Sequence, residues 1–103
     1  MIIVFGRVDV APDHLEQARR IAREHVARSR AEPGCVSHAV YDDPDRPGQL
    51  VFVEEWESEQ ALMRHFAVPA SIGFARELAR LAASEPVIRL LHAKELPFPR
   101  GAA

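Results

Sequence analysis

The sequence is poor in the features that mark several large protein classes. Among its 103 residues it has one cysteine, Cys35, which excludes an intrachain disulfide framework and suits a reducing compartment. Its formal net charge of -2 provides no basic field for nucleic acid or an anionic membrane. No apolar run approaches the roughly 20 residues of a membrane-spanning helix, and no basic segment typical of a signal peptide opens the chain. We therefore expect a cytoplasmic protein with neither a membrane nor a nucleic-acid partner.

Motifs for common cofactors and metals are also missing. The chain has no Gly-rich phosphate loop and no nicotinamide or flavin fingerprint. Its five histidines, His14, His25, His38, His65 and His92, lack the HExxH spacing of zinc enzymes. The sequence alone therefore predicts neither a metal site nor a bound organic cofactor.

The chain does contain a regular succession of strand and helix patterns. The predicted elements are a strand over 2–10, a helix over 13–30, strands over 35–42 and 50–57, a helix from 58 that breaks near 69, a helix over 71–83 and a strand over 87–93. Asp13 and Glu16 match a capping box at the start of the first helix, and Ser58 matches an N-cap of the next.

This order of elements predicts an α+β protein. Strand, helix, strand, strand, helix, strand is the ferredoxin-like βαββαβ pattern, with one four-stranded antiparallel sheet and its helices on one face. The first and third strands carry apolar residues on both faces. A bare apolar sheet face on so small a protein implies a partner, so we expect a homodimer whose two sheets face each other, a dimeric α+β barrel. Residues 1–96 form the domain, and residues 97–103 form an irregular tail.

The stretch 49–66 carries the main candidates for function. Glu54 and Trp56 share one face of a predicted strand, and His65 lies on the following helix. A histidine with a near-neutral pKa suits a base that removes a proton from a phenol or an activated C–H group. An indole offers a flat wall to an aromatic ring, and a carboxylate can orient a histidine or a substrate hydroxyl. The structural alternatives are a hydrogen-bonded His65 at a helix–sheet seam, a core Trp56, and a Glu54 paired with an arginine.

Three further residues are candidate substrate contacts. Arg7 can stabilise a developing oxyanion, or it can bridge a dimer as an ion pair. Tyr41 and His38 lie on opposite faces of one predicted strand, so at most one of them faces a pocket. Phe66 follows the candidate base directly, although a phenylalanine in such a pattern more often belongs to the core.

Several of these residues, taken together, resemble a known family, that of the antibiotic biosynthesis monooxygenases, which are dimeric α+β barrel proteins. The resemblance is carried by Arg30–Cys35, Tyr41, Glu54, Trp56, Ser58, His65 and Pro69. It extends from Ile2 to Leu96. The family includes cofactor-free oxygenases of anthrone-like polyketides, quinol monooxygenases, haem-degrading enzymes and small isomerases, so the resemblance is a poor guide to substrate.

Two departures narrow what the resemblance implies. Members similar to quinol monooxygenases often have a second histidine where this chain has Ala70. The haem-degrading branch uses an asparagine in its first strand and a tryptophan at the position of His65. This chain has Gly6 and Arg7 in that strand, which argues against haem.

The resemblance implies a cofactor-independent monooxygenase that oxidises an aromatic quinol or anthrone with molecular oxygen. In that interpretation His65 takes the proton, Trp56 and apolar residues hold the ring, and oxygen reacts directly with the substrate anion. Two alternatives stay open. An isomerase or epimerase of small metabolites would need two proton-transfer groups and a polar pocket. A non-enzymatic dimer that binds a hydrophobic ligand would have a closed pocket without ionisable groups.

Overall fold

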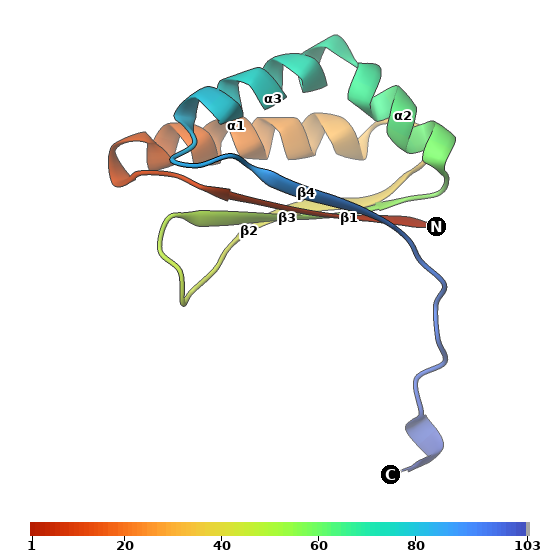
Figure 1. Cartoon of the computed structure of the whole chain (residues 1–103). Helices are drawn as coiled ribbons and strands as arrows, with labels where there is room; N and C mark the ends of the chain where they lie inside the picture. Colours follow the sequence, from red (N-terminus) through yellow and green to blue (C-terminus); the bar gives the residue numbers. More distant parts are fainter. Residues whose placement is uncertain (103) are drawn as a thin grey trace.

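The computed structural model describes residues 1–102 and has two layers, with the helices on one face of a four-stranded sheet (Figure 1). The elements are β1 (Ile2–Asp9), α1 (Pro12–Arg30), β2 (Cys35–Asp42), β3 (Gln49–Trp56), α2 (Glu59–Ala67), α3 (Pro69–Leu81), β4 (Val87–His92) and the short 3-10 helix η1 (Arg100–Ala102). The sheet order is β2-β3-β1-β4, and all neighbouring strands are antiparallel. The predicted ferredoxin-like βαββαβ fold is therefore confirmed.

The alternation of side chains along β3 delivers polar groups to the space beneath the helices. Leu50, Phe52, Glu54 and Trp56 point to the helical layer and are all buried, while Val51 points to the opposite face. A carboxylate and an indole thus lie on the same side of the sheet as the helices, as the sequence pattern predicts.

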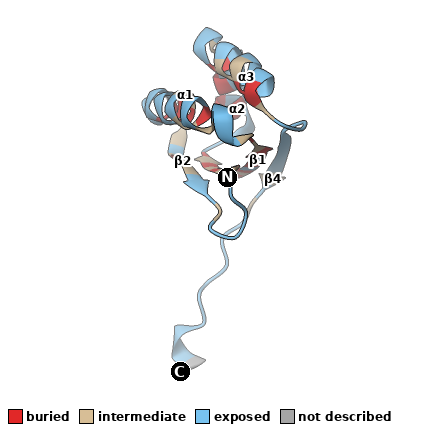
Figure 2. Cartoon of the chain, turned by 90° about the vertical axis from the view of Figure 1, so that its left-hand side faces the viewer, coloured by how far each residue is buried: buried red, intermediate tan, exposed pale blue. Residues whose placement is uncertain are grey.

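Two apolar clusters hold the helices on the sheet. The first consists of Val8, Val10, Ala18, Ala22, Leu50, Phe52, Leu78 and Leu81. The second consists of Ile2, Val4, Trp56, Ala61 and Leu62. In Figure 2 the buried residues lie where the helices and the sheet face each other. Each large apolar side chain that is fully buried contributes about 1.5–3 kcal/mol, so these clusters fix the frame around the site.

The capping box predicted at Asp13 and Glu16 is wrong. Helix α1 begins at Pro12, its N-cap residue is Ala11, and no side chain caps its first N–H groups. Proline favours the first helical position because its φ is already near the helical value and it has no N–H to leave unpaired. The helix therefore begins earlier than a capping box would require. Asp13 falls in the first turn, where the helix dipole favours a negative charge.

The predicted break between the second and third helices is confirmed, with one shift in position. Ser58 caps α2, and its Oγ accepts a hydrogen bond of 3.1 Å from the Ala61 N–H. Helix α3 begins at Pro69 rather than at the predicted Ser71. The same preference of proline for the first helical position explains the shift. The break lets α2 and α3 run in different directions over the sheet (Figure 1).

The turn between α1 and β2 approaches α2 closely. Gly34 in this turn has a φ of +83°, a conformation that favours glycine. A Cβ at Gly34 would collide with the side chain of Ala61 on α2. The Cys35 N–H donates a 3.2 Å hydrogen bond to the carbonyl of Glu32. Glycine therefore permits the close approach that brings Glu32 beside α2.

The outer face of the sheet presents apolar side chains to solvent. Phe5, Tyr41 and Val87 are 39%, 58% and 45% exposed, and Val51 and Val53 are half-buried. Within residues 1–102 no helix packs on this face (Figure 1). This is the face on which a second copy is expected to pack, and that pairing stays a prediction.

Beyond β4 the chain leaves the two layers (Figure 1). Leu96 and Phe98 are 80% and 75% exposed. The predicted division between a domain over 1–96 and a tail over 97–103 stays a prediction, and residue 103 lies outside the described residues. None of the helices in the described part of the chain is both long enough and apolar enough to cross a bilayer.

Candidate functional site

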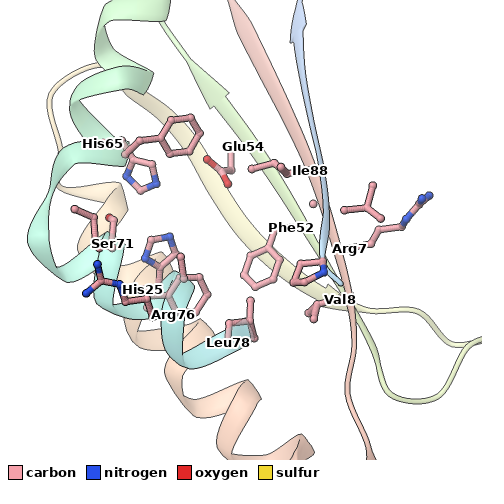
Figure 3. Close-up of a pocket in the computed structure, with 17 residues that line it drawn as sticks. Arg7, Val8, His25, Phe52, Glu54, His65, Ser71, Arg76, Leu78 and Ile88 are labelled. Carbon is pink, nitrogen blue, oxygen red and sulfur yellow. The ribbon is translucent and has the colours of Figure 1, made fainter. Parts of the chain in front are cut away.

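A cavity of about 420 Å³ lies between the sheet and the helices. Its polar lining includes His25, Glu54, His65 and Ser71, and its apolar lining includes Val8, Phe52, Phe66, Ile72, Phe74 and Leu78. In Figure 3 the histidines project from the helical layer toward Glu54 on the sheet. A mostly apolar cavity of this size with a few convergent polar groups is typical of a small-molecule site.

His65 on α2 is buried and held by a carboxylate. Its Nδ1 lies 2.9 Å from Glu32 Oε1, and its side chain is 3% exposed. A carboxylate accepts hydrogen bonds, so in the neutral imidazole this contact favours the tautomer with its proton on Nδ1 and with Nε2 as the acceptor. His65 is thus oriented as a proton acceptor. The sequence singled out His65 but not Glu32, because the two residues meet only through the approach of α2 to the Gly34 turn.

Glu54 on β3 is a buried carboxylate with two partners. Its Oε1 accepts a 2.8 Å hydrogen bond from Trp56 Nε1 and lies 3.3 Å from His38 Nε2. Burial raises the pKa of the Glu54 carboxyl, but His38, the Trp56 N–H and His65 together outweigh burial and lower the pKa below its ordinary value. Glu54 is therefore ionised at neutral pH, and its partners are an indole and an imidazole rather than an arginine.

Trp56 lies behind Glu54 instead of lining the cavity. Its side chain is fully buried in the second apolar cluster, and its ring centroid is 4.6 Å from that of His65. The structure therefore places Trp56 in the core, where it orients Glu54 and supports His65. Trp56 is not among the residues that line the cavity, and its predicted contact with a substrate ring stays a prediction.

Of the three remaining predicted contacts, Phe66 and Arg7 border the cavity, and Tyr41 does not. Phe66 lines the cavity. Arg7 borders it, but its side chain points away from the histidines (Figure 3). Tyr41 lies on the outer face and is 58% exposed, whereas His38 on the same strand points inward and is 1% exposed. Arg7 therefore lies at the edge of the cavity, and Tyr41 does not line the cavity of its own chain.

Two further histidines join the candidate site: His38, which the sequence analysis weighed against Tyr41 as the residue facing a pocket, and His25, to which it gave no role. His25 on α1 and His38 on β2 meet His65, and one ring nitrogen from each lies within 4.8 Å of the others. The His25 ring stacks on Phe74 with 4.0 Å between centroids. The available signals were a histidine in the apolar stripe of α1 and a histidine on the inward face of β2. Linear spacing cannot join them, because the three rings come from separate elements.

We call His25, His38 and His65 the histidine cluster. His25 is uncharged at neutral pH, and several ring nitrogens of the cluster have no hydrogen-bond partner. Burial, with smaller contributions from His38 and His65, lowers the pKa of His25 to about 3. In the described residues, His25 Nδ1 and both ring nitrogens of His38 have no hydrogen-bond partner. His38 Nε2 is close enough to Glu54 for electrostatic attraction but is not aligned for a hydrogen bond. A buried polar group without a partner costs about 1–3 kcal/mol.

Comparison with known proteins agrees with this architecture. The family model described as antibiotic biosynthesis monooxygenase matches residues 1–77. The chain belongs to this family. The resemblance carried by the sequence motifs is therefore confirmed, and membership in the antibiotic biosynthesis monooxygenase family supports an oxidoreductase function of the monooxygenase type.

Two curated proteins match most of this chain. The uncharacterized protein sll1783 of Synechocystis is 32% identical over 89 residues, which cover 86% of this chain and 60% of that protein. This chain thus spans less than two thirds of that relative. Rv0793 of Mycobacterium tuberculosis, described as a candidate monooxygenase, is 27% identical over 90 residues, which cover 87% of this chain and 88% of its own length.

Solved structures of family members share the fold. The structure of Rv0793 has a TM-score of 0.86 at 25% identity, covering 92% of this chain and 96% of that chain. A candidate antibiotic biosynthesis monooxygenase of Deinococcus radiodurans has a TM-score of 0.90 at 24% identity, covering 95% of this chain and 97% of that chain. At such identity the second likeness supports the fold alone.

Proposed function

We propose that this protein is a monooxygenase that oxidises a small aromatic quinol or anthrone with molecular oxygen, without a bound organic cofactor. Family membership supports the oxygenase class. The observation that carries the proposal is the placement of His65, which is buried at an apolar cavity with its Nδ1 bonded to Glu32.

The lining of the cavity supports an aromatic substrate. Phe52, Phe66 and Phe74 border it and offer ring faces and edges to a flat ligand. Glu54 and His65 are polar groups on opposite layers, so they can orient a hydroxyl at one edge of the ring. A ring held by the phenylalanines would place its acidic proton beside His65.

The chemistry begins with proton removal. His65 Nε2 accepts a proton from the phenol or the activated C–H group, and the carboxylates of Glu32 and Glu54 stabilise the resulting imidazolium. The substrate anion is electron-rich and gives up electrons to oxygen. One oxygen atom enters the product as a carbonyl or hydroxyl oxygen, and the other leaves as water. The substrate supplies all four electrons, so the balance requires no external reductant.

A second candidate function is proton transfer without oxygen. Glu54 and His65 both border the cavity and provide the two groups that an isomerase or epimerase needs. The predominantly apolar lining favours the aromatic substrate instead. A purely hydrophobic ligand-binding protein would have no ionisable group in its pocket, so the presence of His25, Glu54 and His65 argues against that alternative.

We also propose that the protein acts as a homodimer joined through the outer sheet faces. The exposed apolar residues Phe5, Tyr41 and Val87 support this pairing. Arg7 lies on the same face, so the roles predicted for Arg7 and Tyr41 belong to this interface or to contacts through it.

Oxygen uptake tests the proposed reaction. Purified protein is supplied with a dihydroxynaphthalene or an anthrone, without flavin or other organic cofactor, and oxygen consumption is followed with an electrode. Loss of the base in a His65→Ala variant should lower the rate about 10²–10⁴-fold. The matched control is His92→Ala, because His92 is 78% exposed and is not among the residues that line the cavity. A His65→Ala variant with full activity would remove the base assignment, and a wild-type protein inert toward both substrate types would remove the substrate class.

A further inference from the structure

The histidine cluster contains three buried histidines, and the proposed oxidation uses only one of them as a base. That reaction needs one base, His65, whereas His25 and His38 converge on it from α1 and β2. Both additional rings are buried, at 5% and 1% exposure. The proposed oxidation gives a role to His65 alone, so the positions of His25 and His38 need a separate explanation.

The three rings are available as ligands. A metal-binding histidine coordinates through a ring nitrogen that is not already engaged by another group. The nitrogens that have no partner are His25 Nδ1 and both ring nitrogens of His38. His65 Nδ1 is engaged by Glu32, so Nε2 is the ring nitrogen of His65 that is not held by this carboxylate. A carboxylate on the far nitrogen of a ligating histidine is the usual outer support of a metal site.

The electrostatics of the cluster favour a cation. Glu54 is a buried carboxylate whose Oε1 lies 3.3 Å from His38 Nε2. It also accepts a hydrogen bond from the indole of Trp56, which fixes its orientation. The carboxylates of Glu54 and Glu32 therefore flank the three imidazoles on two sides. Such surroundings lower the electrostatic cost of a buried positive charge.

We propose that His25, His38 and His65 form a binding site for one divalent first-row transition-metal ion, with Glu54 beside it as a carboxylate ligand. Imidazole ligands suit zinc, copper, cobalt, nickel and iron, whereas magnesium and calcium prefer oxygen ligands. Metal–nitrogen bonds of about 2.0–2.1 Å in a tetrahedral site bring the ligand nitrogens to about 3.4 Å from one another. Small rotations of the three rings from their present separation of up to 4.8 Å suffice for this.

The proposed metal site goes beyond the proposed oxidation and competes with it for one atom. A metal bound to His65 Nε2 would occupy the nitrogen that accepts the substrate proton. Metal-loaded and metal-free protein are therefore different states of the same cavity. Metal binding is tested below by readouts that do not involve activity, so the two proposals can fail independently.

A cobalt titration tests the site directly. The full, tag-free chain is freed of metal with a chelator, dialysed, and titrated with Co²⁺ while its visible absorption is recorded. We expect saturation at one ion per chain, with ligand-field bands of a histidine-rich site that Zn²⁺ displaces. Mg²⁺ should not displace them. The proposal would be overturned if no ligand-field bands appear during the titration.

Variants assign the ligands. His25→Phe preserves an aromatic ring against Phe74 and His38→Gln preserves a polar side chain, and each should weaken cobalt binding more than 10-fold. Glu32→Gln, which alters only the support of His65, should weaken it about 10–100-fold. His14→Ala and His92→Ala are the matched controls, because both histidines are exposed. Retention of wild-type affinity in His25→Phe and His38→Gln would overturn the assignment, as would loss of binding in the controls.

Thermal unfolding of the wild-type protein keeps the test decisive even if the cluster variants do not fold. A ligand that binds only the folded state raises its stability. We expect Zn²⁺ at one equivalent to raise the unfolding temperature of the metal-free wild type and to leave it unchanged when a chelator is present. An unfolding temperature that does not respond to any of the five transition metals would refute the site.

Discussion

Side chains alternate between the two faces of the sheet, and the two faces differ in how deeply those side chains are buried. On the inner face of β3, Phe52, Glu54 and Trp56 are buried under helices. On the outer face, Phe5 and Tyr41 keep about two fifths and more than half of their surface in solvent. What distinguishes the faces is their cover, not the hydrophobicity of the strands. On the inner side, the pKa values of Glu54 and His25 are both lowered. The outer face instead exposes apolar surface on which a partner can pack.

The largest expected contrast between the faces concerns stability. Trp56→Ala removes a fully buried indole and the hydrogen-bond donor to Glu54. It should cost about 3–5 kcal/mol in free energy of unfolding. Tyr41→Ala on the outer face should change the stability of the monomer by less than about 0.5 kcal/mol. Urea unfolding at a concentration where the chain is monomeric measures both. Similar losses in the two variants would mean that the faces do not differ in this way.

The second prediction concerns Glu32, whose carboxylate contacts His65 on the inner side of the sheet. Glu32→Gln keeps the shape of the side chain but removes the charge that orients the imidazole at Nδ1. We expect kcat/KM for aromatic oxidation to fall about 10–100-fold, because partners of a catalytic group typically contribute that much. A purely structural role would lower stability and leave the pH profile of kcat/KM in place. A shifted pH profile with unchanged unfolding would show that Glu32 positions the base.

The outer face has its own test. Phe5→Glu places a charge in the middle of the exposed apolar surface, beside Arg7 and Arg89. We expect the dissociation constant of the dimer to rise at least about 5-fold, since a central aromatic residue of an interface commonly contributes more than 1 kcal/mol. Sedimentation velocity over a concentration series measures the change. A wild-type chain that is monomeric at high concentration would contradict the proposed dimer.

The fold could be predicted almost completely from local patterns, and the site only in part. Alternation along the strand places Glu54 on the inner face, and the Ser58 cap and Pro69 mark the ends of α2. These signals act within a few residues. Depth within a layer is not a local property, so the pattern could not show that Trp56 lies in the core while Phe66 reaches the cavity.

The histidine cluster was beyond prediction for the same reason. His25, His38 and His65 lie on three elements, and only the packing of α1 against β2 and the close approach of α2 to the Gly34 turn bring their rings together. The error at Asp13 arose in the opposite way, because a local capping pattern competed with a neighbouring proline that starts a helix equally well.

The smallest predicted effect concerns the helix that carries His65 over the inner face. Ser58→Ala removes the side-chain oxygen that accepts the Ala61 N–H at 3.1 Å, and it should lower the free energy of unfolding by about 1 kcal/mol. For a domain of this size, that loss lowers the unfolding temperature by about 4–8 °C. Ser58→Asp is the matched control, because it retains an acceptor and should stay within a few tenths of a kcal/mol of the wild type. The cap holds the start of α2, whereas Glu32 and Trp56 hold its last turn at His65. Oxidation per folded molecule should therefore be the same in Ser58→Ala as in the wild type. A loss of activity larger than the loss of folded protein would mean that the inner face depends on the whole helix rather than on the contacts around His65.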